Sequence, residues 1–105
     1  MEADIDSLTV DFTDENGVQV TKELDKKVLT KGAWSTLIFK FAEINKTTGE
    51  FGPPKATIRR YQKQQGVYKM RSKFNISSAT QAKQLVSVLS DWFENQTDNG
   101  SEDQD

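Results

Sequence analysis

Cysteine and histidine are both absent from this chain of 105 residues. Without cysteine there are no disulfide bonds, and without either residue type the usual ligand sets of zinc, haem and iron–sulfur centres cannot form. The commonest general base and the thiol nucleophile of enzymes are missing as well. Catalysis would have to rest on carboxylates such as Glu43, Glu50 or Asp91, and the pattern brings none of them together. We therefore expect a protein that is not an enzyme and that holds no metal or cofactor.

Long apolar runs are also missing. No run reaches the length that a membrane-spanning helix needs, and the acidic N-terminus lacks the basic segment with which a secretory signal peptide begins. We expect an intracellular protein, cytoplasmic or nucleoid-associated, without a membrane partner. Its length is that of one domain, and its polar ends leave a small core that a partner subunit would help to stabilise.

Charges of one sign are absent from long parts of the chain. Residues 1–15 and 91–105 each contain six acidic and no basic residues, whereas residues 51–90 contain no acidic residue. The basic residues of residues 51–90 are Lys55, Arg59, Arg60, Lys63, Lys69, Arg71, Lys73 and Lys83. Because a soluble surface normally mixes both signs, this stretch predicts a positive surface that binds an anion. A phosphate backbone is the commonest such anion.

The charge pattern divides the chain into three parts. Residues 1–25 are expected to be an acidic leader that is either disordered or folded as a hairpin, since Leu8, Val10 and Phe12 alternate before the turn signal Asn16-Gly17. Residues 26–94 are expected to form the binding domain, and residues 95–105 an acidic disordered tail. The acidic ends either aid solubility or compete with phosphate for the basic surface, and both alternatives remain open.

Four stretches alternate apolar and polar residues as antiparallel strands do, namely 28–31, 34–44, 55–63 and 67–76. After them the apolar period changes to three and four residues, which indicates a helix that begins at Ser77 or Ser78 and ends near Phe93 or Glu94. The apolar stripe of this helix comprises Ala82, Leu85, Val86, Leu89, Trp92 and Phe93. The expected fold is α+β, a four-stranded antiparallel meander followed by one C-terminal helix (ββββα), with the helix laid across one face of the sheet.

The alternation also predicts the binding surface. A sheet that is covered by a helix on one face leaves its other face to water. We expect that free face to carry the basic side chains of the last two strands, joined by Trp34 and Lys40. Cations would follow the phosphates while unpaired bases stack on Tyr61; Trp34 is either such a contact or part of the core. The candidate nucleic-acid-binding residues are Trp34, Lys40, Lys55, Arg59, Tyr61, Lys63, Lys69, Arg71 and Lys73.

The succession Ile58-Arg59-Arg60-Tyr61, a turn ending at Gly66, a basic strand and Ile76-Ser77 before the helix forms a short motif. In this motif the chain resembles the positive cofactor 4 family of transcriptional coactivators, whose fold group includes the Pur-alpha and Whirly proteins. It departs from the family at Arg60, where the family has an acid, and at Phe74-Asn75, where the family has a glycine. The resemblance implies a homodimer with four strands and one helix per subunit that binds single-stranded DNA through Arg59, Tyr61, Lys69, Arg71 and Lys73.

We therefore predict a weakly sequence-specific single-stranded DNA-binding protein, an accessory factor in transcription or DNA maintenance. Its helix is expected to join two copies as a homodimer through residues that include Leu85, Leu89 and Trp92. Two alternatives remain open. The same face could serve an RNA-binding regulator, because stacking and phosphate contacts do not distinguish the two sugars. It could instead receive an acidic protein partner, in which case the protein would purify free of nucleic acid.

Overall fold

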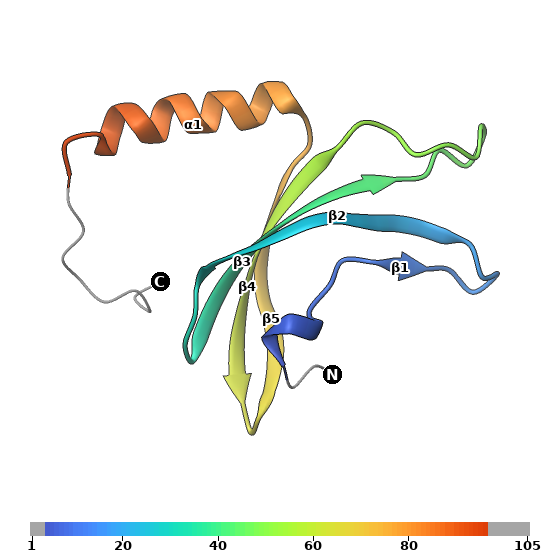
Figure 1. Ribbon diagram of the computed structural model, residues 1–105, viewed down its shortest axis with the longest axis horizontal. Helices are drawn as coiled ribbons and strands as arrows, with labels where there is room; N and C mark the ends of the chain where they lie inside the picture. Colours follow the sequence, from blue (N-terminus) through green and yellow to red (C-terminus); the bar gives the residue numbers. More distant parts are fainter. Residues whose placement is uncertain (1–3, 97–105) are drawn as a thin grey trace.

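The computed structural model describes residues 4–96. Within this range the chain forms five strands in one antiparallel sheet, and the strands follow one another in the order of the sequence. Figure 1 shows a strongly twisted sheet with a helix that projects from one end. The elements are the 3-10 helix η1 (Ile5–Ser7), β1 (Phe12–Thr13), β2 (Gln19–Thr30), β3 (Trp34–Glu43), β4 (Lys55–Gln64), β5 (Val67–Ile76) and the helix α1 (Ala79–Phe93). The predicted α+β class is confirmed, but the sheet has five strands instead of four.

The additional strand comes from the hairpin at the N-terminal side, where β1 pairs with β2. The turn between them is stabilised by the Asp14 carboxylate, which accepts hydrogen bonds from the backbone N–H groups of Asn16 (2.9 Å) and Val18 (3.0 Å). Gly17 has φ +82°, a backbone conformation that glycine adopts without strain. The strand predicted at 28–31 is therefore the end of the much longer β2, which also crosses the expected boundary between residues 25 and 26.

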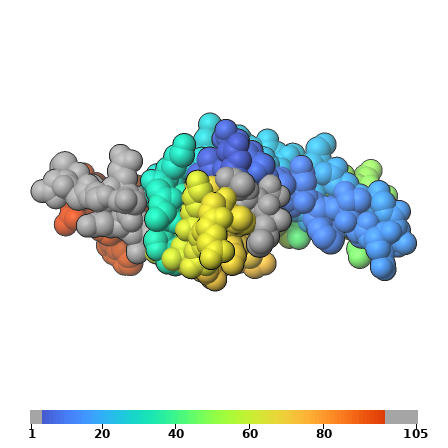
Figure 2. Space-filling model, turned by 90° about the horizontal axis from the view of Figure 1, so that it is seen from below, coloured from blue at the N-terminus to red at the C-terminus, as the bar shows by residue number. Residues whose placement is uncertain are grey.

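One face of the sheet, here named the inner face, carries Leu37, Phe39 and Phe41 of β3, all of which are buried. Ile5, Leu8 and Val10 from the N-terminal segment form one apolar cluster with them. In Figure 2 this segment, in dark blue, lies beside the β4–β5 hairpin in yellow. Residues 5–10, predicted as part of a leader, therefore supply the second layer of the core.

Lys26 of β2 attaches the N-terminal segment to the sheet. Its ammonium group donates hydrogen bonds to the carbonyl oxygens of Ile5 (2.9 Å), Asp6 (3.1 Å) and Leu8 (2.7 Å). These carbonyls belong to η1 and to the residue that follows it, and among them the Ile5 carbonyl also accepts from the backbone N–H of Leu8 (3.4 Å). A lysine of the sheet therefore completes the hydrogen bonding of the segment that covers it.

The helix α1 begins and ends where its pattern predicted. The Ser78 hydroxyl accepts a hydrogen bond from the backbone N–H of Gln81 (3.1 Å), so Ser78 and not Ser77 is the N-cap. The Gln81 side chain accepts in return from the backbone N–H of Ser77 (2.9 Å). The predicted position of the helix is wrong, however. No residue of α1 is buried and the helix contacts the sheet at β5, because the N-terminal segment already covers the inner face.

Candidate nucleic-acid interface

Strand pairing places the basic residues of β4 on the inner face, together with the core. Residues directly opposite each other in an antiparallel pair project from the same face of the sheet. Arg59 lies opposite Leu37 of β3 and opposite Lys73 of β5, and Lys55 lies opposite Phe41. Arg59, Lys73 and Lys55 therefore share the face that Leu37 and Phe41 occupy. The expectation that these cations stand on the opposite face from the core is wrong.

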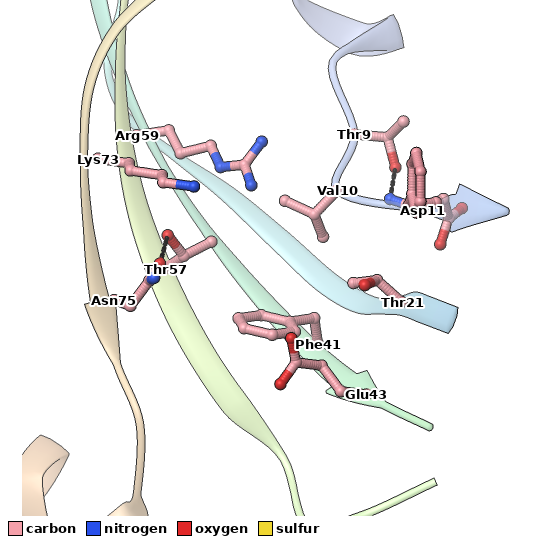
Figure 3. A pocket seen from close by; sticks show the side chains of 11 residues that line it. Thr9, Val10, Asp11, Thr21, Phe41, Glu43, Thr57, Arg59, Lys73 and Asn75 are labelled. Carbon is pink, nitrogen blue, oxygen red and sulfur yellow. Dashed lines mark hydrogen bonds between the residues drawn. The ribbon is translucent and has the colours of Figure 1, made fainter. Parts of the chain in front are cut away.

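Arg59 and Lys73 project into a pocket of about 420 Å³ on the inner face. Figure 3 shows the two side chains side by side, pointing from β4 and β5 towards the N-terminal segment that carries Val10 and Asp11. Below them the Thr57 hydroxyl donates a hydrogen bond to the Asn75 carbonyl oxygen Oδ1 (2.7 Å). This bond fixes the orientation of the Asn75 amide, whose NH₂ group is the remaining donor at that wall.

Arg59 is half-buried and lies against the core. Its Nε atom is buried and has no hydrogen-bond partner among residues 4–96. Its guanidinium carbon Cζ lies 5.9 Å from the ring centroid of Phe39, so an aromatic side chain supports the group from the core. Neither Arg59 nor Lys73 forms an ion pair with a described residue. A guanidinium, an ammonium and an amide N–H at one wall provide the donors that a phosphate group needs.

The opposite side of the pocket is acidic. Asp11 accepts a hydrogen bond from the backbone N–H of Glu23 (2.6 Å), and Glu43 accepts one from the Lys55 ammonium (2.8 Å). Lys55 is therefore already paired with a carboxylate and is a weaker candidate for a phosphate contact than Arg59 or Lys73. The pocket is therefore divided into a basic side on β4 and β5 and an acidic side that carries Asp11 and Glu43.

Tyr61 does not offer the stacking surface that was predicted for it. It is 5% exposed and belongs to the core cluster with Leu37 and Tyr68. A ring that is enclosed on both faces has no surface left for a base. Lys63 lies two residues further along β4, is exposed, and places its ammonium 5.3 Å from the ring centroid of Tyr68. The inner face therefore offers cations for phosphates and a buried aromatic layer beneath them.

The other candidate residues lie on the opposite face of the sheet, here named the outer face. Trp34 lies opposite Gln62 of β4, which in turn lies opposite Lys69 of β5. The register of β4 and β5 shifts between Arg60 and Tyr61, and this irregularity directs Lys69 outwards while Lys73 stays inside. The sequence-predicted set is thus divided: Lys55, Arg59, Tyr61, Lys63 and Lys73 lie on the inner face, and Trp34, Lys40, Lys69 and Arg71 on the outer face.

Arg60 is a candidate that the pattern did not select. Its guanidinium carbon lies 4.4 Å from the ring centroid of Trp34, which is a close cation–π contact. The signal was present in the sequence, because Arg60 and Trp34 both alternate out of phase with the residues of the core. That Arg60 and Trp34 meet follows from the strand register. Arg60 lies opposite Thr36, in the row next to the pair Trp34–Gln62 on the same face of the sheet.

Comparisons of the chain with models of protein families, with curated proteins and with solved structures found no match. The resemblance to the positive cofactor 4 family therefore stays a prediction. Within residues 4–96, no helix is long and apolar enough to cross a membrane. The same part of the chain contains no group of three or more side chains suited to hold a metal ion.

Proposed function

We propose that the protein binds single-stranded nucleic acid, with DNA as the expected ligand, along the inner face of β4 and β5. The observation that carries this proposal is the pair Arg59–Lys73, two cations in directly opposed positions that project into the same pocket without an acidic partner in the described part of the chain. Lys63 extends the positive surface towards the β4–β5 turn. The role is that of an accessory factor in transcription or DNA maintenance, and the binding is weakly sequence-specific because its main contacts are to phosphates.

The shape of the site favours a single strand over a duplex. The N-terminal segment forms one wall of the pocket and β5 the other, so the cations lie between two walls. Proteins that read a duplex usually insert a helix or a two-stranded ribbon into its major groove. The helix α1 carries one cation, Lys83, and its apolar stripe is unsuited to a groove lined by phosphates.

The proposal is tested by fluorescence anisotropy with matched single-stranded DNA, single-stranded RNA and duplex DNA at several salt concentrations. For the single strand, the logarithm of the affinity should fall with the logarithm of the salt concentration by about 0.7 per phosphate contacted. Arg59→Ala should lower that slope by about 0.7, since one phosphate contact is lost. Lys83→Ala removes the same charge from the helix and should leave the slope unchanged.

Four outcomes would change this assignment. Preferential binding of the duplex would contradict the proposed site, and equal effects of Arg59→Ala and Lys83→Ala would show that net charge alone drives binding. Tighter binding of RNA than of DNA would identify a contact to the 2′-hydroxyl and an RNA-binding role. Failure to bind any of the three would instead favour an acidic protein partner.

The same chain is proposed to act as a homodimer. Leu85, Leu89 and Trp92 of α1 border one apolar hollow, and the exposed fractions of Leu89 and Trp92 are 50% and 68%. Exposed apolar patches of this kind usually mark a contact surface. A second copy is the occupant that we propose, because a helix carrying so wide an apolar stripe can bury it against the same stripe of its symmetry mate.

A further inference from the structure

The part of the outer face next to the β4–β5 turn holds a second group of cations. We name it the hairpin patch and define it by Trp34, Arg60, Lys69 and Arg71. Trp34, Gln62 and Lys69 form one row across β3, β4 and β5, and Thr36, Arg60 and Ser72 form the next row. The four side chains of the patch therefore come from two adjacent rows and from the irregular position between them.

The patch is ordered by contacts within it. Arg71 donates hydrogen bonds from Nε to the Gln62 side-chain oxygen (3.1 Å) and from a terminal nitrogen to the Gln64 side-chain oxygen (2.7 Å). Arg60 lies over the ring of Trp34 at 4.4 Å. Neutral amides hold Arg71 in place without neutralising it, and neither Lys69 nor Arg71 forms an ion pair with residues 4–96. Lys69 and Arg71 therefore keep their positive charge available to an anion.

The rest of the outer face has a different character. Further from the turn, the next row consists of Lys27, Ile38, Ile58 and Phe74, and beyond it lie Asp25, Lys40, Ala56 and Ile76. On β4 and β5, the cations of the outer face are therefore confined to the hairpin patch. They are gathered at the end of the sheet that is furthest from the start of α1, next to the turn at Gln65 and Gly66.

The hairpin patch and the inner site meet around this turn. Lys63 faces inwards in the pair Lys63–Tyr68, and Lys69 faces outwards in the neighbouring pair Gln62–Lys69. Since β5 is the last strand of the sheet, no further described strand separates the two surfaces at that edge. A chain of phosphates that leaves the inner site past Lys63 reaches Lys69 and Arg71 by passing around the end of the hairpin.

We propose that the hairpin patch is a second contact surface for the same single strand, which bends around the β4–β5 hairpin from the inner to the outer face. This inference rests on the proposed function of the inner site. On the outer face, Lys69 and Arg71 contact phosphates, and an unpaired base stacks on the Arg60–Trp34 pair, because guanidinium planes and aromatic rings both accept bases.

The bend makes a prediction about strand length. The strand β4 has ten residues and is about 33 Å long, so a short oligonucleotide occupies the inner site alone. A long oligonucleotide reaches both faces of the sheet. The test compares oligonucleotides of about 6 and about 24 nucleotides, lengths on either side of the usual site sizes of sheet-based single-strand binders. The double substitution Lys69→Ala and Arg71→Ala should weaken binding of the long strand about tenfold and leave the short strand within about twofold.

The matched control is the double substitution Lys22→Ala and Lys27→Ala, which removes two exposed charges from the outer face on β2, two strands away from β4. It should change neither affinity by more than about twofold. As a second readout, Trp92→Phe leaves Trp34 as the single tryptophan of the chain. Its fluorescence should be quenched by the long strand and not by the short one. Far-ultraviolet circular dichroism confirms that each variant folds.

Each other outcome overturns the inference in a recognisable way. Equal weakening of both lengths by Lys69→Ala and Arg71→Ala would place these residues in the primary site or show a general charge effect. No weakening of either length would remove the patch from the binding surface. If the wild-type protein bound neither length, the proposed function itself would fail, whereas binding of both lengths without a length-dependent loss would refute the bend alone.

Discussion

At the scale of single residues, the cations of this protein fall into groups with different structural roles. Lys26 donates to three carbonyl oxygens of the N-terminal segment, and Lys55 is paired with Glu43. Arg59 and Lys73, by contrast, have no acidic partner among the described residues and face a pocket. Counting positive charges in the sequence therefore overestimates the binding surface. What separates the groups is whether the hydrogen-bonding groups of the side chain are already used inside the protein.

Lys26→Met provides a direct test of this division. The substitution keeps most of the aliphatic side chain and removes the donors that hold η1, so it should lower the free energy of unfolding by about 1–3 kcal/mol. The measurement is urea denaturation followed by circular dichroism. Lys27→Met is the matched control, because Lys27 is exposed and faces the other side of the sheet, opposite Ile38. If both substitutions cost the same, the three hydrogen bonds of Lys26 do not hold the segment.

At the scale of elements, α1 stands apart from the rest of the fold. A helix of fifteen residues is marginal in water without tertiary packing, and no residue of α1 is buried. Its N-cap therefore matters more than the cap of a packed helix would. The Ser78 hydroxyl satisfies the backbone N–H of Gln81, and the reciprocal bond from Gln81 to Ser77 involves the backbone of Ser77.

Ser78→Ala should destabilise this helix by about 1 kcal/mol, which is the usual cost of losing a serine cap. The expected result is a smaller helical signal in circular dichroism at low protein concentration, with the unfolding of the sheet unchanged. Ser77→Ala is the control, since it preserves the backbone N–H of Ser77 that donates to Gln81 (2.9 Å) and removes only the longer bond from the Ser77 hydroxyl (3.4 Å). A loss of helix in Ser77→Ala as large as that in Ser78→Ala would argue against the capping geometry.

The elements were more predictable than their arrangement. The cap at Ser78, the change of period at Ala82 and the turn before Val67 are local signals, and each produced an element where it was expected. The faces were not predictable in the same way. Which residue of β3 lies opposite Arg59 depends on register, and the direction of Lys69 depends on an irregularity of the pairing with β4. Neither the register nor the irregularity can be recognised from the alternation of residues within a single strand.

The segment that covers the inner face was not predicted, for a related reason. Ile5, Leu8 and Val10 are three apolar residues in an acidic surrounding, and their composition indicates a polar leader. They become core because they pack against Leu37 and Phe39 of the inner face, and because Lys26 binds the intervening carbonyls. The amphipathic stripe of α1 was the stronger local signal for a cover, yet that stripe is exposed.

At the scale of the whole molecule, three surfaces of different chemistry are separated in space. The hairpin patch is basic and lies towards the β4–β5 turn, whereas α1 and the row Ile38–Ile58–Phe74 are apolar and lie towards the other end of β5. The pair Arg59–Lys73 of the inner site is next to that apolar row along the strands but projects from the opposite face of the sheet. This separation allows assembly through the apolar end to leave the basic surfaces accessible. The acidic tail predicted at 95–105 lies almost entirely outside the described residues, and its effect on binding stays a prediction.

Leu89→Glu tests the proposed homodimer. Placing a charge in the apolar stripe should change the mass measured by sedimentation from that of two chains to that of one, because burying an unpaired carboxylate is costly. The sheet should remain folded, since Leu89 is exposed in the single chain. Ser87→Glu adds the same charge beside the stripe and should preserve the larger mass. A wild-type protein that sediments as one chain at all concentrations would exclude this assembly.

The packing of the N-terminal segment against the sheet has a practical consequence for experiments on shortened forms of this protein. A fragment that begins at Lys26 would keep every residue of the basic stretch 51–90 and is therefore an obvious choice for a minimal binding fragment. It would also lack the N-terminal segment that covers Leu37 and Phe39, whose side chains are completely buried in the intact chain. We expect such a fragment to aggregate, and its failure to bind DNA would then reveal nothing about the cations it retains.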